Sequence, residues 1–187
     1  MRREPELAFI FPNKPNQIHQ PRVVFQSIDL ARWLVQPKWA GHRALPQCNR
    51  AGEITVYSRH GRPLTLAAKD NWQWLAMLID LPRPWLLDGE LCRDGNMVIW
   101  DIGIMGNKIL ADEPYEKRLA VLREILPQGK NKAHQRIEPI QTFSGENWTQ
   151  VTQSEKIEGV VWKVRDARDL WGVHSTRDVG SQMKYLF

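Results

Sequence analysis

The chain has 187 residues, of which 42% are hydrophobic and 25% charged, and its formal net charge is +5. This composition predicts one folded domain and argues against intrinsic disorder, and no apolar run is long enough to span a bilayer. The N-terminal residues Met1–Pro5 are charged and lack the apolar stretch of a signal peptide. We therefore expect a cytoplasmic protein with no membrane partner. The positive charge is compatible with a nucleic-acid partner, although many basic proteins bind none.

The first third of the chain predicts an irregular start followed by a hairpin. Several proline and asparagine residues precede Pro21, and within this stretch residues 7–11 form a short apolar run that can be a strand. Residues 42–47 and 53–58 predict two strands, because the second alternates between apolar and polar side chains. The turn at Arg50–Gly52 lies between them, so we expect the two strands to pair.

The middle of the chain predicts a helix and a second hairpin. Residues 70–81 carry apolar side chains at helical spacing, and Pro82 ends this pattern. Residues 85–92 and 97–102 predict two strands. Between them, residues 93–96 contain Asp-Gly, which tolerates the positive φ of a hairpin turn.

The last third again mixes helix and strand. Residues 115–126 predict a helix with one apolar stripe, and residues 137–143 and 157–164 predict strands. Residues 147–156 predict a short polar helix or loop, and residues 183–187 can form a final strand. The overall pattern indicates an α+β fold with largely antiparallel sheets, and the sequence has no glycine-rich phosphate loop of the two common types.

Polar side chains form four clusters at the edges of predicted strands, and their position there calls for an explanation. The four clusters are Lys38–Arg43, Ser58–Gly61, Asp88–Leu91 and Glu158–Lys163. Each alone is typical of a solvated turn, but their order and spacing together are informative. In this order they resemble the motifs of the nucleotidyltransferase superfamily, which contains ATP-dependent DNA ligases, RNA ligases and mRNA capping enzymes.

The wording of individual segments carries this resemblance. Residues 38–43 are similar to the motif of the nucleophilic lysine, and residues 158–163 match Glu-Gly-x-Val-x-Lys. Residues 58–61 resemble the Ser-Arg-x-Gly element of DNA ligases, and residues 87–91 read Leu-Asp-Gly-Glu-Leu, as in the third motif of the family. Three further segments carry it too. Residues 99–102 resemble the aromatic-Asp-Ile/Leu element, residues 115–119 the Pro-Tyr-x-x-Arg segment of bacterial ligases, and residues 183–185 the closing lysine motif. The match runs from about Leu34 to the C-terminus.

The resemblance implies a fold. We expect an ATP-grasp-like nucleotidyltransferase (adenylation) domain of mostly antiparallel sheets with flanking helices. It would occupy residues 1–187 as a single domain, with residues 1–33 as an N-terminal lead-in. DNA ligases and capping enzymes continue into an OB-fold domain, which we expect to be absent because the sequence stops at Phe187.

The resemblance also implies a reaction. A lysine attacks the α-phosphate of ATP and forms lysyl-AMP, AMP passes to a 5′-phosphate at a nick, and the adjacent 3′-hydroxyl displaces AMP. Lys38 stands at the position of the catalytic nucleophile. A free lysine has a pKa of about 10.4, so desolvation and nearby cations are needed to release its proton. The residues implied to bind nucleotide are Gln36, Arg43, Arg59, Glu90, Trp100, Val161, Lys163 and Lys184.

The implied roles differ from residue to residue. Trp100 would stack on adenine and Val161 would close its other face, while Gln36 lies where the family often places a Glu near the adenine amine. Arg59 would contact phosphates of the nucleotide or of the nicked strand, and Arg43 the ribose or a phosphate.

A divalent metal ion is implied as well. Glu90 and Glu158 are the candidate ligands for Mg²⁺ or Mn²⁺, because one or two carboxylates suffice for an ion that keeps its waters. Glu90 could instead hold the ribose. Competing structural interpretations stay open: Trp100 as a core side chain, the two glutamates as surface charges, and Asp101 as an acceptor at a strand end.

The sequence departs from the family at two motif positions. Ala40 stands where DNA ligases and capping enzymes usually have Asp, and the closing motif keeps only Lys184 of two lysines. Either change could slow adenylylation or weaken ATP capture. Together with the expected lack of an OB-fold, they keep a degenerate, non-catalytic binding module open as a third hypothesis.

The leading hypothesis is a minimal ATP-dependent DNA ligase that seals nicks in duplex DNA, with a protein partner replacing the OB-fold domain. Such an activity would serve DNA repair, replication and recombination. The second hypothesis is an RNA ligase of the same fold, which a comparison of nicked DNA and RNA substrates would separate. Detection of a stable lysyl-AMP would exclude the non-catalytic module.

Overall fold

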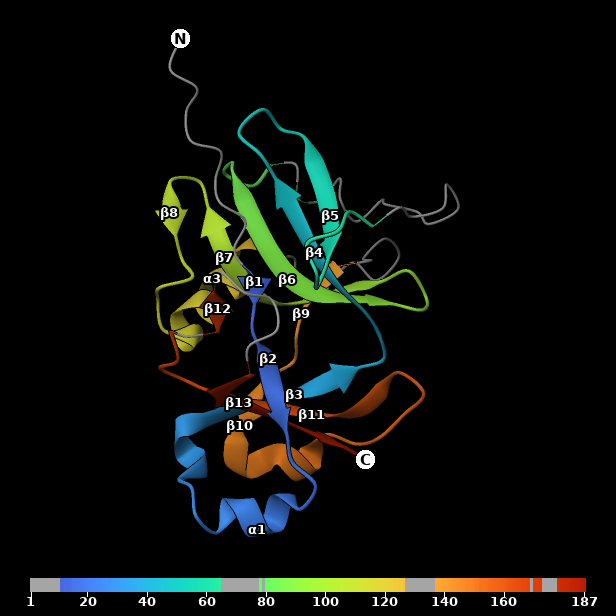
Figure 1. Ribbon diagram of the computed structural model, residues 1–187, viewed down its shortest axis with the longest axis vertical. Coiled ribbons are helices and arrows are strands. Elements are labelled where there is room, and N and C mark those ends of the chain that lie inside the picture. Colours follow the sequence, from blue (N-terminus) through green and yellow to red (C-terminus); the bar gives the residue numbers. More distant parts are fainter. Residues whose placement is uncertain (1–10, 65–77, 79, 127–136, 169, 173–177) are drawn as a thin grey trace.

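The structure is a computed structural model that describes residues 11–64, 78, 80–126, 137–168, 170–172 and 178–187. Its strands form a five-stranded sheet, a six-stranded sheet and a separate two-stranded pair (Figure 1). Pairing is antiparallel except between β13 and β2 and between β7 and β9, whose bounds follow. The expected α+β class with mostly antiparallel sheets is therefore confirmed. Within these ranges, the helices are too short or too polar to cross a membrane.

The five-stranded sheet lies in the lower half of Figure 1 and has the order β10-β3-β11-β13-β2. Its strands are β2 (Lys14–Gln17), β3 (Trp33–Trp39), β10 (Phe143–Ser144), β11 (Ile157–Val164) and β13 (Asp178–Leu186). Three short helices accompany it: α1 (Pro21–Phe25), η1 (Leu30–Arg32) and η2 (Gly145–Gln150). Trp33, Val35, Val160 and Trp162 form the core on their side of the sheet, with the ring of Phe25 from α1 against Trp162.

The six-stranded sheet lies in the upper half of Figure 1, with the order β5-β4-β6-β7-β8 and β9 beside β7. Its strands are β4 (Gly41–Cys48), β5 (Ile54–Ser58), β6 (Trp85–Cys92), β7 (Met97–Met105), β8 (Lys108–Ile109) and β9 (Ile137–Pro139). Helix α3 (Tyr115–Ile125) contacts β7, and its Leu122 joins a core with Leu87, Ile99 and Ile102.

A third core joins the two sheets. Leu34 of β3 packs in one cluster with Leu45 of β4, Leu86 of β6 and Trp171. Trp171 belongs to β12 (Trp171–Gly172), which pairs with β1 (Phe11–Pro12) as the two-stranded pair. The chain passes directly from one large sheet to the other between Trp39 and Gly41. The third residue of the nucleophile-like motif, Ala40, is thus the link between the sheets.

Several predicted elements have the observed bounds. Residues 85–92 and 157–164 are β6 and β11, and helix α3 ends one residue before its predicted end. The two predicted hairpins form, and Gly95 in the second turn has φ of 80°. Strand β7 continues three residues beyond Ile102 to Met105.

The structure corrects two predictions. The single strand expected over 137–143 is two strands in different sheets, β9 beside β7 and β10 beside β3. Between them the buried Ile140 donates its backbone N–H to Ile99 O at 2.8 Å, so this apolar run is a crossing between the sheets. The irregular start also contains β1 and β2. The helix predicted over 70–81 falls almost wholly outside the described residues, as do residues 7–10.

Candidate active site

A cavity of about 510 Å³ is lined by both large sheets. Its lining includes Lys38 and all of the residues predicted to bind nucleotide, namely Gln36, Arg43, Arg59, Glu90, Trp100, Val161, Lys163 and Lys184. Of the predicted site residues, only Glu158 is not part of the lining. The structure thus brings residues from 36 to 184 to one place, while the role of each remains a prediction.

Strand periodicity explains the wall that the five-stranded sheet contributes. Successive side chains of a strand point to opposite faces, so alternate residues share a face. One face carries the buried core of this sheet. The other face gives the cavity lining Gln36 and Lys38 from β3, Val161 and Lys163 from β11, and Gln182 and Lys184 from β13. Gln36, Val161 and Lys184 lie side by side in register across the three strands.

Lys38 and Glu158 form an ion pair because of a β-bulge. Glu158 is the extra residue where the register between β11 and β3 shifts, between Ile157 and Gly159. A bulge re-aims a side chain that simple alternation would turn to the other face. The Glu158 carboxylate contacts the Lys38 ammonium, and their side chains are 46% and 26% exposed. The pair therefore sits at the open edge of the cavity.

Glu90 is a buried carboxylate in the opposite wall. Its residue is 8% exposed, and burial raises the pKa of Glu90 to about 7, although the charges of Lys38 and Arg43 oppose this rise. Gly41 makes room beside it, because a Cβ at Gly41 would collide with the Leu91 carbonyl and the Glu90 side chain. At neutral pH this carboxyl can hold or release a proton.

Arg43, Asp88 and Trp100 form a rigid corner of the six-stranded sheet. The Arg43 guanidinium donates from Nε to Asp88 Oδ1 at 2.8 Å and from Nη2 to Oδ2 at 2.6 Å. Trp100 Nε1 donates to the same Oδ2 at 2.6 Å. The Trp100 ring lines the cavity with its orientation fixed by this bond, and Arg43 lies 5.8 Å from its centroid.

Lys163 is a buried cation. Its Nζ lies 4.5 Å from the centroid of Tyr115 and 5.7 Å from that of Trp100, and it donates to the Tyr115 hydroxyl at 3.3 Å. Burial lowers the pKa of Lys163 to about 8, although Asp101 and Asp88 favour the charged form. Lys163 therefore stays mostly charged at neutral pH, with no carboxylate in direct ion pairing among the described residues.

Gln36 presents a carbonyl oxygen that none of the described residues satisfies. Its side chain is 1% exposed, and its Nε2 donates to the Tyr115 hydroxyl at 2.6 Å and to Thr142 Oγ1 at 3.1 Å. Within the described part of the chain, Gln36 Oε1 accepts no hydrogen bond. A buried acceptor without a donor costs free energy unless a ligand supplies the donor.

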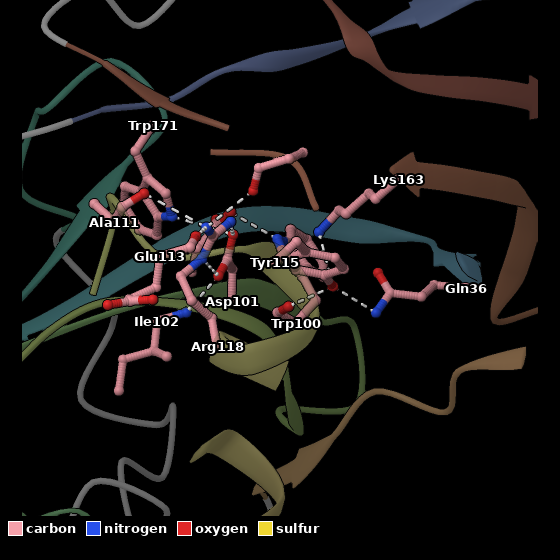
Figure 2. Close-up of polar contacts among 12 residues, drawn as sticks. Gln36, Trp100, Asp101, Ile102, Ala111, Glu113, Tyr115, Arg118, Lys163 and Trp171 are labelled. Carbon is pink, nitrogen blue, oxygen red and sulfur yellow. Dashed lines mark hydrogen bonds and ion pairs between the residues drawn. The ribbon is translucent and has the colours of Figure 1, made fainter. Parts of the chain in front are cut away.

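A second buried polar cluster lies beside the ring of Tyr115, on the other side from Gln36 and Lys163 (Figure 2). The Arg118 guanidinium binds Asp101 through Nε at 2.7 Å and Nη2 at 3.0 Å. Asp101 also accepts from the backbone N–H of Ile102 at 2.8 Å and from Trp171 Nε1 at 3.1 Å. Arg118 has no exposed surface. This geometry supports the interpretation of Asp101 as a structural acceptor, although Asp101 lies inside β7 and not at a strand end.

Sequence reasoning gave no role to several residues around the cavity. Lys14, His42 and His60 line it, and Tyr115 and Thr142 hold Gln36 from behind. Lys14 reaches the site through the parallel pairing of β2 with β13, which leaves no local sequence signal. Tyr115 lies in the segment 115–119, whose resemblance to a ligase segment was the one available signal in the sequence.

The acidic residues suit a metal ion that takes few protein ligands. In the described ranges no group of three or more His, Cys, Asp or Glu side chains could hold a metal. Glu90 and Glu158 lie close enough for the charge of Glu158 to affect the pKa of Glu90. Mg²⁺ binds through one or two carboxylates together with substrate phosphates, so this pair fits such an ion and not an all-protein cage.

Comparison with known proteins gives similar folds but no sequence match. No model of a known family and no curated protein matches the sequence. A mycobacterial DNA ligase D, solved with ATP and MES, aligns with 97% of this chain at 17% identity and a TM-score of 0.70. The ligase domain of LigD from M. tuberculosis aligns with 96% at 19% identity and a TM-score of 0.64. A structure from a study of Lig E DNA ligases aligns with 95% at 16% identity and a TM-score of 0.59.

These likenesses show the fold. The chain has the fold of the nucleotidyltransferase domain of DNA ligases, as the sequence motifs indicated. It spans 61% and 60% of the two LigD chains and 68% of the Lig E chain. The chain thus corresponds to about three-fifths of the LigD structures, and activity and partners require arguments from its own residues.

Proposed function

We propose that this chain catalyses lysine adenylylation as a minimal ATP-dependent DNA ligase, with Lys38 as the nucleophile. We further infer that residues 1–187 act as one nucleotidyltransferase unit. The observation that carries the proposal is the convergence of Lys38, the buried acceptor Gln36 Oε1 and the buried cation Lys163 on one cavity. A nucleotide needs three such contacts: to its base, to its phosphates and to an attacking group.

The neutral amine of Lys38 attacks the α-phosphorus of ATP. The Nζ–P bond forms, the bond from that phosphorus to the bridging oxygen breaks, and pyrophosphate leaves with the electron pair. Before the attack, the Lys38 ammonium must lose one proton, which the Glu158 carboxylate in contact with Nζ can accept. The second proton leaves Nζ as the N–P bond forms and passes to the departing pyrophosphate. The bulge at Glu158 therefore supplies the attacking group with a base.

Cations from both sheets would stabilise the charge that develops on the phosphates. Lys163 and Lys184 line the five-stranded wall and Arg43 the opposite one. A cation in a desolvated site acts more strongly on a transition state than one in water, because little solvent screens it. The lowered pKa of Lys163 reflects this desolvation, which disfavours its charged form.

Glu90 would hold the metal ion, which would neutralise phosphate charge and orient the pyrophosphate leaving group. Glu158 is the second candidate ligand, and during the attack it acts as the base instead. Both carboxylates lie near the Lys38 ammonium, so the ion would bind beside the attacking group. The aromatic face of Trp100 would stack on the base, and its bond to Asp88 holds the ring in place.

Intact-protein mass spectrometry after incubation with ATP and Mg²⁺ tests the proposal. We expect the wild type to gain the mass of one AMP and Lys38→Ala to gain none. Lys117→Ala is the matched control, because Lys117 is an exposed lysine on α3 that does not line the cavity. An adduct that persists in Lys38→Ala would show that another residue is the nucleophile, and no adduct with ATP and Mg²⁺ or Mn²⁺ would favour a binding module.

Substrate choice requires a second measurement. With the adenylylated protein in hand, we expect transfer of AMP to the 5′-phosphate of nicked duplex DNA and then sealing, a step that repair, replication and recombination all require. Nicked or single-stranded RNA in the same assay decides between a DNA ligase and an RNA ligase. Sealing of RNA alone would contradict the DNA assignment and leave the lysyl-AMP chemistry intact.

A further inference from the structure

The amide of Gln36 has a fixed orientation, which a glutamine at this position does not have by itself. An amide can rotate by half a turn and present either its oxygen or its NH₂ to a ligand. Two hydroxyl groups, from Tyr115 and Thr142, lie against the Gln36 nitrogen at 2.6 Å and 3.1 Å. Whether they donate or accept decides which way the amide faces.

The Tyr115 hydroxyl can only accept from Gln36, because its proton is already used. That proton goes to the backbone carbonyl of Trp100 at 2.8 Å. Trp100 is the residue left without a register partner where β7 bulges against β6, so its carbonyl needs this donor. Lys163 also donates to the same hydroxyl oxygen, as Figure 2 shows. Burial raises the pKa of Tyr115 well above its usual value, so the proton stays in place.

The Thr142 hydroxyl is committed in the same way. It donates to the backbone carbonyl of Ile140 at 3.2 Å, in the segment that crosses between the two sheets. Its oxygen is therefore an acceptor toward Gln36 Nε2. With two acceptors against its nitrogen, the Gln36 amide keeps Oε1 on the side away from Tyr115 and Thr142, which do not line the cavity that Gln36 lines. Rotation would set an oxygen against both hydroxyl oxygens at the loss of two hydrogen bonds.

We propose that Tyr115 and Thr142 are positioning residues that make the site select a purine with an amino group at C6. Neither residue lines the cavity. They act through Gln36, whose oxygen accepts from the C6 amine of adenine and opposes the C6 carbonyl oxygen of hypoxanthine or guanine. Discrimination of this kind is strong, because the wrong base leaves a buried polar group unpaired.

The inference rests on the proposed function for its ligand, a nucleotide whose base binds at Gln36, and for its readout. We would measure formation of the nucleotidyl-lysine adduct with ATP and with ITP, whose base carries a carbonyl at C6. We expect the wild type to prefer ATP by roughly a hundredfold or more. Thr142→Val and Tyr115→Phe, which remove the hydroxyls with little change of shape, should each lower this ratio by roughly tenfold, because one hydrogen bond against amide rotation is lost.

A rescue variant separates positioning from general damage. In Gln36→Glu, both side-chain oxygens are acceptors, so the cavity receives an acceptor in either orientation. The Tyr115 and Thr142 hydroxyls would turn to donate to the other carboxylate oxygen, which is a stronger acceptor than the backbone carbonyls to which they donate in the wild type. The ATP preference should persist in Gln36→Glu, and adding Thr142→Val should change it by less than about twofold. Thr152→Val, at an exposed threonine, is the control and should leave the ratio unchanged.

The outcomes distinguish this inference from the proposed function. Adduct formation in the wild type with an ATP preference that Thr142→Val and Tyr115→Phe leave intact would overturn the positioning role alone. If no adduct forms, the proposed chemistry fails, and calorimetric titration with ATP and with ITP tests the same ratio as affinities. Equal affinities in the wild type, or binding of neither nucleotide, would overturn the inference; an ATP preference that Thr142→Val reduces would support it.

Discussion

Two buried polar clusters both contact the ring of Tyr115 and differ in how far their groups are satisfied. The structural cluster consists of Asp101, Arg118 and Trp171, and within the described residues each of its charged groups has a close partner. The cavity cluster consists of Gln36, Glu90 and Lys163. Its members include an acceptor with no described donor, a carboxyl with a pKa of about 7 and a cation with a pKa of about 8.

The difference separates a group that stabilises the fold from one that waits for a ligand. Close partners of opposite charge stabilise the ionised form of a buried group. Burial without such partners shifts the pKa of the group in the direction that favours its neutral form. Perturbed groups in a cavity are therefore candidates for binding and catalysis. The same reasoning predicts opposite responses when each cluster is mutated.

The largest effect should come from breaking the structural cluster. Arg118→Met leaves the Asp101 carboxylate buried with two donors among the described residues, Trp171 Nε1 and the backbone N–H of Ile102. We expect a loss of about 3–5 kcal/mol in the free energy of unfolding, measured by urea denaturation. Lys117→Met, at a lysine that is 71% exposed on the same helix, should cost less than about 0.5 kcal/mol. A loss below about 1 kcal/mol for Arg118→Met would show that this cluster does not stabilise the fold.

The cavity cluster should respond in the opposite direction. Lys163→Met removes a buried cation and keeps the apolar stem, so we expect a gain of about 1–3 kcal/mol in unfolding free energy at pH 7 without nucleotide. The same variant should lose most of its capacity to form the lysyl-AMP adduct. A stability loss would mean that Lys163 supports the fold through its contacts with Tyr115 and Trp100.

The pH dependence of stability sharpens this assignment. The pKa of Lys163 falls from 10.5 to about 8 in the folded state, so between these values the unfolded state binds more protons. The stability contribution of Lys163 therefore rises with pH in this window, by about 2 kcal/mol from pH 8 to pH 10. Urea denaturation at several pH values should show this rise as the difference between wild type and Lys163→Met. A difference that does not change with pH would place the Lys163 pKa near its ordinary value.

The smallest effect should come from Trp100, whose ring centroid lies 5.7 Å from Lys163 Nζ of the cavity cluster. Trp100→Phe keeps an aromatic face and loses the indole N–H that donates to Asp88, while both Arg43 bonds to Asp88 remain. We expect a stability loss of about 1 kcal/mol or less and a change in ATP affinity below about threefold. Trp100→Ala should weaken ATP binding by about tenfold, because it removes the stacking face. Equal affinities of the two variants, measured calorimetrically, would exclude stacking.

Local patterns predicted much of the fold. Strands β6 and β11 and helix α3 follow from alternation, helical spacing and turn residues, because each pattern is complete within its own segment. The prediction of one strand over residues 137–143 was wrong, because two short strands in different sheets share one apolar run. The prediction of an irregular start was incomplete for a related reason, since β2 forms through its pairing with the distant strand β13.

The candidate site was predictable in its membership and not in its contacts. The motifs named Lys38, Glu90 and Lys163 by their order along the chain, and the fold places all three around one cavity. No sequence pattern indicated Thr142, because its role depends on the position of Gln36, 106 residues away.

The sequence by itself indicated the candidate residues for the chemistry and the strands that hold Glu90 and Lys163, since motif spacing and side-chain alternation are local properties. It did not predict β3, the strand that holds Gln36 and Lys38. Only the tertiary structure decided where those side chains point. The bulges at Glu158 and Trp100 exist because neighbouring strands are out of step, and they turn Glu158 toward Lys38 and free the Trp100 carbonyl for Tyr115. Pairing between strands distant in sequence sets these offsets, so no single segment contains the information.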